Sequence, residues 1–197
     1  LYESCQHLPQ IMAEEAWAIH KGEDGAEPVV IAIVDSGTDW QDEDLIDNVW
    51  QNLAEDADGD GVTTEFIDGE WVLDPDDLNG IDEDDNGYTD DLIGWAFEES
   101  NISGDGSNPD AAPFNDDHGT HCAGIAAGTT NNEVGISSIS YNLTYMPVHT
   151  SDATDFLPYA YDGIIYAAEN GADIISNSWS GVVFSQANQE VVNYAHG

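Results

Sequence analysis

An aspartate and a histidine occupy the two places in this sequence where pattern and side-chain chemistry point to a reaction. Asp35 ends the apolar run PVVIAIV and precedes Ser-Gly-Thr, whereas His118 opens the small-residue segment HGTHCAGIAAG. A carboxylate that orients an imidazole allows the imidazole to act as a general base toward a hydroxyl group. Asp35 and His118 are therefore the candidate catalytic pair. The alternative for Asp35 alone is a cap of the following turn, a common role for an aspartate before glycine.

A second histidine, His121, follows three positions after His118, and two histidines can share a metal ion. A zinc helix of the HExxH type places its histidines four positions apart and carries a glutamate between them. HGTH has neither feature, so zinc is disfavoured and His121 is predicted to be a buried, hydrogen-bonded structural residue. Cys122 lies among small apolar residues, which favours a buried reduced thiol over a disulfide with Cys5.

The segments that must position this pair alternate between strand-like and helix-like patterns. Residues 28–35 form a short, β-branched apolar run, typical of a strand covered on both faces in a parallel sheet. Further strands are predicted at 141–150 and 172–180, and helices at 10–20, 118–128, 156–170 and 184–197. This alternation predicts an α/β fold with a parallel sheet. Ligands bind such sheets beyond the carboxyl ends of the strands, where Asp35 stands.

The charge balance is extreme, with 41 acidic residues against the single basic residue Lys21 and a formal net charge of −40 over 197 residues. Nucleic-acid binding is excluded as a function class, because no basic patch can displace counterions from phosphates. Carboxylates that folding brings together must be solvated, protonated or held by a cation. The composition therefore favours adaptation to high salt, stabilisation by calcium, or both. No apolar run approaches the ~20 residues of a membrane-spanning helix.

Residues 42–110 are dense in Asp, Gly and Asn, and they are predicted to be an irregular insertion that needs cations to become ordered. Two of its segments, DADGDGVT and DEDDNGYTDD, place oxygens at alternate positions with glycine sixth, as calcium loops of EF-hand type begin. The predicted ligands are Asp56, Asp58, Asp60 and the Val62 carbonyl in the first loop, and Asp82, Asp84, Asn86 and the Tyr88 carbonyl in the second.

Neither loop has the glutamate that closes an EF-hand site at the twelfth position, because Ile67 and Ile93 stand there. The closing carboxylate must come from elsewhere. Candidates are Asp68 or Glu65 for the first loop and Asp90 or Asp91 for the second.

The pair of segments VDSGTDWQDEDL and DDHGTHCAGIAAG resembles the subtilisin-like serine proteases (subtilases, peptidase S8 family), whose catalytic residues occur in the order Asp, His, Ser. QIMAEEAW, MPVHT and GADIISNSWSG also resemble segments of this family, so the likeness spans essentially the whole chain. Residues 79–95 are similar to a calcium-binding insertion of bacterial secreted members. The resemblance implies a three-layer subtilisin-like fold and a secreted protein.

The resemblance also implies roles for individual residues. Asp35 would orient His118, which would take a proton from a serine. Ser178, Trp179 and Ser180 would line the first specificity pocket and bind an extended peptide, although SNSWS reads equally well as a strand end with a packed tryptophan. A third calcium site is implied by the resemblance alone, at Asp44, Asn132 and the carbonyls of Thr130, Val134 and Ile136.

The sequence departs from the family in one large respect. It contains neither the Gly-Thr-Ser-Met-Ala motif of the nucleophile nor the Ala-Gly-Asn segment of the oxyanion site. Residues 1–197 are therefore interpreted as the amino-terminal portion of one catalytic domain, with the carboxyl-terminal portion as an expected partner. The resulting hypothesis is a secreted serine endopeptidase, stabilised by two or three calcium ions, that acts on peptides or proteins. A non-catalytic peptide-binding module and a calcium-dependent structural or adhesive domain are the rival functions.

Overall fold

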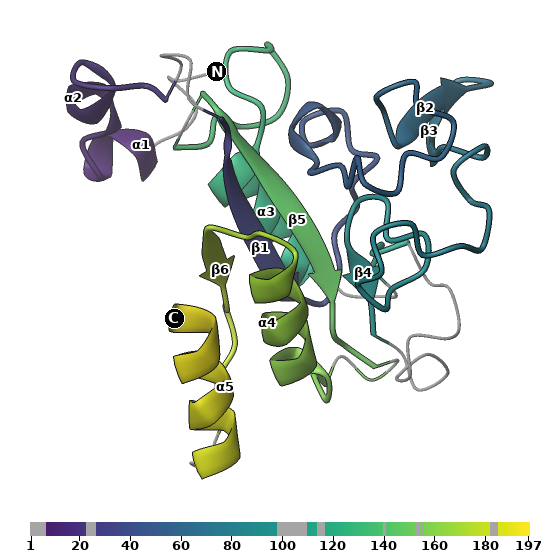
Figure 1. Ribbon diagram of the computed structural model, residues 1–197. Helices are drawn as coiled ribbons and strands as arrows, with labels where there is room; N and C mark the ends of the chain where they lie inside the picture. The colour runs from purple at the N-terminus through teal and green to yellow at the C-terminus, as the bar shows by residue number, and fades with distance from the viewer. Residues whose placement is uncertain are drawn as a thin grey trace.

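A parallel sheet lies at the centre of the computed structural model (Figure 1), which describes residues 7–22, 27–97, 110–113, 117–139, 141–152, 154, 156–181 and 185–197. Within these ranges the sheet has four strands in the order β4-β5-β1-β6, and each neighbouring pair is parallel. The strands are β1 (Val29–Asp35), β4 (Trp95–Ala96), β5 (Leu143–His149) and β6 (Ile174–Ser176). The predicted α/β class with a parallel sheet is confirmed.

Helices cover both faces of the sheet, which gives three layers (Figure 1). On one face lies α3 (His118–Ala127), and on the other lie α4 (Ala160–Glu169) and α5 (Gln186–His196). The alternation of side chains along a strand explains how β1 serves both layers. Ile31 and Ile33 pack in the cluster that contains the α3 residue Ala123, whereas Val34 packs in the cluster that contains Ile164 of α4.

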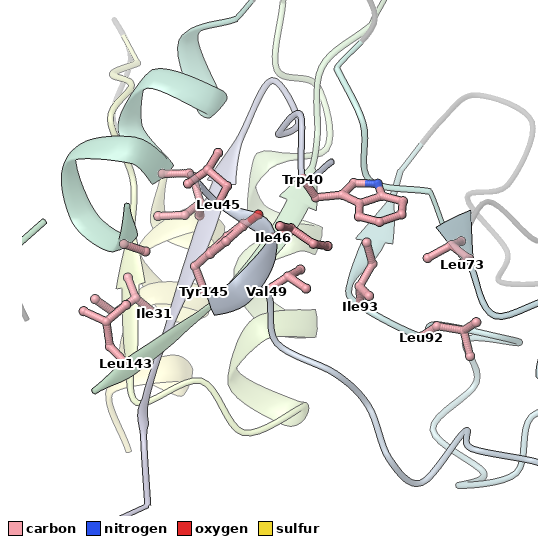
Figure 2. Packing of buried hydrophobic residues seen from close by; sticks show 13 residues of the cluster. Ile31, Trp40, Leu45, Ile46, Val49, Leu73, Leu92, Ile93, Leu143 and Tyr145 are labelled. Atoms are coloured by element: carbon pink, nitrogen blue, oxygen red, sulfur yellow. The ribbon is translucent and has the colours of Figure 1, made fainter. Parts of the chain in front are cut away.

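The insertion contributes more regular structure than its sequence predicts. It contains the turn η1 (Ile46–Asn48), the antiparallel hairpin of β2 (Thr64–Ile67) and β3 (Glu70–Leu73), and β4 of the central sheet. Figure 2 shows how it is anchored: Trp40 and Ile46 lie between Tyr145 of the sheet and Leu73 and Leu92 of the insertion. The few apolar side chains of this polar segment thus extend the core of the domain.

Several predicted boundaries differ from the observed ones. The helix expected at residues 10–20 is two short helices, α1 (His7–Gln10) and α2 (Ala13–Trp17), because Met12 adopts a left-handed conformation with φ of 59°. The strand expected at 172–180 is limited to β6, and the helix expected from residue 156 begins at Ala160. None of the described helices has the length and apolar character needed to cross a bilayer.

Candidate active site and cation-binding loops

The fold brings the predicted catalytic pair into direct contact. Asp35 ends β1 and is almost completely buried, and its Oδ1 lies 2.8 Å from Nδ1 of His118, the first residue of α3. The same Oδ1 accepts the backbone N–H of Ser36 at 2.8 Å. The side chain of His118 is 47% exposed, so the imidazole lies partly at the protein surface. This arrangement is an imidazole oriented by a buried carboxylate.

Glycine residues permit this contact, because backbone segments approach more closely than a Cβ atom allows. A Cβ at Gly119 would lie 2.1 Å from the carbonyl oxygen of Gly37. Gly37 itself has φ of 91°, and a Cβ there would lie 2.8 Å from the Ala112 oxygen. Gly119 also donates its N–H to the Ser36 hydroxyl at 3.0 Å. The small residues after His118 therefore let α3 start directly against the turn that follows Asp35.

A matched pair of glycine substitutions tests this account. Gly119→Ala is expected to lower the free energy of unfolding by about 1–3 kcal/mol, because the methyl group must displace the Gly37 backbone. Gly124→Ala lies on the same helix, and its Cβ would meet only Ile136 Cδ1 at an ordinary 3.6 Å. Helix propensity then predicts a gain of up to about 1 kcal/mol. Thermal denaturation of both variants measures the difference, and equal effects would refute the close approach at Gly119.

Two further expectations for α3 have different outcomes. His121 is exposed. The prediction that it is a buried structural histidine is therefore wrong. Cys122 is a free, half-buried thiol whose Sγ lies 3.9 Å from His118 Nδ1. Its proposed partner Cys5 lies outside the described residues.

The predicted substrate segment follows β6. Ser178 and Ser180 are exposed, whereas Trp179 is half-buried and donates its indole N–H to the Val34 carbonyl at 3.0 Å. The indole ring packs edge-on against Tyr161 of α4, with ring centroids 5.5 Å apart. The tryptophan is therefore anchored at Val34, one residue before the end of β1, and the two serines that flank it are exposed.

The first acidic loop gathers five carboxylates. Oxygens of Asp56, Asp58 and Asp60 lie within 4.8 Å of one another, and a second such group joins Asp60 to Glu65 and Asp74. Between the two alternatives for the closing carboxylate, Glu65 lies in this cluster and Asp68 is in none of the groups formed by the described residues. The backbone N–H of Val62, whose carbonyl was a predicted ligand, donates to Asp60 Oδ1 at 3.0 Å.

The second acidic loop is organised around a buried glutamate, Glu55, that the sequence pattern does not indicate. Oxygens of Glu55, Asp84 and Asp91 lie within 4.8 Å of one another, and a further group joins Glu55 to Glu83 and Asp90. Glu55 has no exposed surface, and it accepts the N–H groups of Glu83, Asp84 and Asp90 at 2.9, 3.2 and 3.1 Å.

The remaining predicted ligands of the second loop have other contacts. Asp82 accepts the N–H groups of Asn86 and Gly87 and is in none of the carboxylate groups among the described residues. The amide nitrogen of Asn86 faces Asp84 and Asp91 at 3.2 and 3.1 Å, and its oxygen accepts the N–H of Tyr88 at 2.7 Å. Asn86 therefore lies at the centre of the loop, but its oxygen must turn inward to bind a cation.

The third site, implied by the resemblance, is brought together in part. Asp44 accepts the Asn132 amide at 2.9 Å and the Ile136 N–H at 2.7 Å. Val134 donates its N–H to Asn132 Oδ1 at 3.1 Å, and the Thr130 hydroxyl lies 3.4 Å from that of Ser138. The loop therefore wraps around Asp44, with N–H groups directed at its oxygens.

The side-chain atoms with which the first two loops could bind a metal ion are all oxygens. Oxygen is the ligand atom that Ca²⁺ and Mg²⁺ prefer. No basic side chain accompanies them, because Lys21, the only basic residue of the chain, lies over the ring of Tyr141 instead. Clustered and partly buried carboxylates without a basic partner fit a divalent cation well.

Comparison with known proteins identifies the family. The sequence model described as the subtilase family matches residues 26–196. The chain belongs to the subtilase family. Thermitase from Thermoactinomyces vulgaris is 38% identical over 105 residues, which are 52% of this chain and 34% of thermitase. A calcium-dependent protease from Trichormus variabilis is 42% identical over 64 residues, covering 32% of this chain and 9% of that protein.

The halolysin-like extracellular serine protease Nep from Natrialba magadii is 30% identical over 176 residues, covering 88% of this subtilase chain and 24% of Nep. The 197 residues thus span about a third of thermitase and smaller shares of the other two relatives. Membership confirms the family resemblance that the Asp35 and His118 segments indicated.

Burial raises the pKa of Glu55, which contacts the second loop of this subtilase, and of Asp91, which belongs to it. The pKa of Glu55 rises from 4.5 to about 7, and that of Asp91 rises from 3.8 to about 7, in each case mainly through desolvation. Nearby Asp84 adds like-charge repulsion at both residues. Without a cation, both carboxyls therefore hold a proton more tightly in the folded chain than in the unfolded chain.

This shift predicts an unusual pH dependence of stability in the presence of a chelator. Because the folded state binds more protons than the unfolded state, stability is greatest below the ordinary carboxyl pKa and is lost as pH rises through about 7. The melting temperature in chelator should be higher at pH 6 than at pH 8, and Glu55→Gln should flatten this difference. A melting temperature in chelator that rises from pH 6 to pH 8 would contradict the assignment.

Proposed function

We propose that this chain is the portion of a calcium-stabilised serine endopeptidase that carries the catalytic aspartate and histidine. The observation on which the proposal rests is the 2.8 Å contact between Asp35 Oδ1 and His118 Nδ1, at the carboxyl end of a parallel strand. Membership of the subtilase family supports the same reaction, the hydrolysis of peptide bonds.

This contact supports a separate role for each member of the pair. Asp35 accepts a hydrogen bond from Nδ1–H of His118, which leaves Nε2 as the nitrogen that accepts a proton. Nε2 takes the proton from a serine hydroxyl as the serine attacks the peptide carbonyl, and then gives it to the leaving amine. The buried carboxylate of Asp35 stabilises the imidazolium that exists between these two steps.

We place the nucleophilic serine and the oxyanion donors in sequence outside residues 1–197. The nucleophile and oxyanion motifs of the family do not occur within them, and the chain spans only about a third of thermitase. The carboxyl-terminal part of the catalytic domain is then a required partner of this portion. The 197 residues alone should not hydrolyse peptides at a useful rate, because nucleophile and oxyanion stabilisation supply most of the catalysis.

The substrate is proposed to bind beside β6 as an added strand. β6 pairs only with β1 within the described sheet, and the exposed Ser178 and Ser180 follow it. An extended peptide can pair with such backbone, while side-chain pockets provide selectivity. In this interpretation Trp179 holds the segment against the core through its contacts with Val34 and Tyr161.

Calcium is proposed as the cation of the acidic insertion. Asp56, Asp58, Asp60, Glu65 and Asp74 would hold one ion, and Glu55, Asp84 and Asp91 with Asn86 would hold another. When bound, calcium neutralises these carboxylates and orders the loops that carry them. Asp44 and its loop are the third candidate. The name of the Trichormus variabilis relative supports calcium dependence, and the name of Nep supports an extracellular location for this protein.

The full-length protein provides the test against the two rival functions. We expect it to hydrolyse a denatured protein substrate, to be inactivated by a serine-directed sulfonyl fluoride, and to encode a Gly-Thr-Ser-Met-Ala motif after Gly197. Peptide binding without hydrolysis would instead identify a non-catalytic module. Calcium-dependent folding with neither hydrolysis nor peptide binding would identify a structural or adhesive domain.

A further inference from the structure

Two polar side chains at the carboxyl-terminal end of α4 contact the second acidic loop. Tyr166 has no exposed surface, and its hydroxyl donates to Asp91 Oδ2 at 2.6 Å. Asn170, the C-cap residue that follows α4, accepts the Asn86 amide on its Oδ1 at 2.9 Å. Asp91 and Asn86 both belong to the proposed calcium site. The carboxyl-terminal end of α4 and the residue after it therefore contact that site at two points.

Aromatic rings surround Tyr166, and they offer its hydroxyl few hydrogen-bond partners. The ring packs edge-on against Tyr88, with centroids 4.8 Å apart, and against Phe97 at 6.2 Å. Trp95 completes this aromatic cluster through Tyr88, at 5.2 Å. A hydroxyl among buried rings is costly unless it is hydrogen-bonded. The short bond to Asp91 satisfies it, and in doing so fixes the orientation of the carboxylate.

The Asp91 carboxylate has room for a cation in addition to the hydrogen bonds that it accepts. Its Oδ1 accepts the Asn52 amide at 2.9 Å, and its Oδ2 accepts Tyr166 at 2.6 Å and the Asn86 amide at 3.1 Å. An ionised carboxylate has about four lone-pair positions, so roughly one remains. The donors that surround Asp91 are neutral, and they orient the carboxylate without cancelling its charge.

Tyr166 is also connected to the segment proposed to bind the substrate. The helix that carries it also carries Tyr161, against which Trp179 packs. After Asn170 only a short turn at Gly171, with φ of 87°, separates α4 from β6. Whatever fixes α4 therefore also fixes the support of Trp179.

We propose that Tyr166 is a positioning residue for a divalent cation held by Asp84, Asn86 and Asp91, and that the bound cation fixes α4. The proposal rests on the calcium site of the second loop described under the proposed function. Side chains that hydrogen-bond to metal ligands orient those ligands, and their removal weakens metal binding about 10- to 100-fold. Tyr166 stands in this relation to Asp91.

Calcium titration of the full-length protein tests the proposal, with the near-ultraviolet circular dichroism of the aromatic cluster as the signal. Tyr166→Phe keeps the ring and removes only the hydroxyl, and it should raise the half-saturating calcium concentration by about 10-fold or more. Tyr161→Phe is the matched control, because it removes a hydroxyl from the same helix without touching the loop, and it should leave the titration unchanged. In an Asp91→Asn background, Tyr166→Phe should have no further effect.

Melting temperatures separate positioning from a merely structural role. The proposal predicts that Tyr166→Phe lowers the melting temperature more in calcium than in chelator. An equal loss in both, or a calcium titration of Tyr166→Phe that matches the unsubstituted protein, overturns it. If Asp84→Asn also leaves the titration unchanged, the calcium site itself is wrong, which is a different failure from that of Tyr166.

Discussion

Replacement of His118 by alanine is expected to lower kcat of the full-length protein by about 10⁶-fold, because the general base of the serine is lost. Asp35→Asn should be less severe, at about 10⁴-fold, since the imidazole remains but loses the partner that selects its tautomer. The 2.8 Å contact between the two side chains is the reason for both expectations. Steady-state hydrolysis of a chromogenic peptide measures each effect.

The control for this prediction is His196→Ala. His196 is an exposed histidine in the last turn of α5, and its loss should leave kcat unchanged. Melting temperatures of all three variants should stay close to that of the unsubstituted protein, which separates a chemical effect from unfolding. A His118→Ala enzyme that keeps more than about 1% of kcat would reject the assigned base.

The second large effect concerns the charge of the calcium loops, and its sign depends on calcium. Calcium at 100 times its dissociation constant stabilises the folded state by about 2.7 kcal/mol, or roughly 5–10 °C in melting temperature. Asp84→Asn should remove most of the contribution of the second loop. In chelator the same substitution should raise the melting temperature, because it removes the repulsion of Asp84 on Glu55 and Asp91, while the asparagine oxygen can still accept the Asn86 N–H.

Asp85→Asn provides the matched control in the same loop. Asp85 is exposed, belongs to none of the carboxylate groups among the described residues, and has φ of 57°, a conformation that asparagine tolerates. The substitution Asp85→Asn removes one negative charge without removing a ligand. Its effect on the melting temperature should therefore be small and should have the same sign with and without calcium. Asp84→Asn with the same sign in both conditions would contradict a cation at this loop.

The strand and helix that carry Asp35 and His118 could be predicted from sequence, because the residue pattern of each segment agrees with the packing that the fold requires of it. The β-branched run that ends at Asp35 is suited only to a buried strand, and the small residues after His118 suit a helix in close contact with backbone. Local pattern also located the two acidic loops in which carboxylates gather, because alternating oxygens with a central glycine form a short-range motif.

What the sequence could not reveal depends on contacts between distant residues. Glu55 follows an ordinary turn and differs from its acidic neighbours only in being completely buried. Asp74 reaches the first loop because the β2–β3 hairpin folds back, and β2 and β3 have no alternating pattern strong enough to predict it. The sequence pattern indicates only that Tyr166 lies on the apolar face of a helix. The hydrogen bond of its hydroxyl to Asp91 appears only in the structure. The exposure of His121 likewise depends on packing, which spacing does not reveal.

The central claim is that Asp35 and His118 activate a serine supplied by another part of the protein. The most direct test is the rate at which a fluorophosphonate probe labels the full-length enzyme, because the probe reacts with activated serines. We predict labelling of one serine beyond residue 197, identified by peptide mass spectrometry, and a loss of at least about 10³-fold in the labelling rate with His118→Ala. Labelling at an equal rate in both proteins, or labelling of a serine within residues 1–197, would contradict the account.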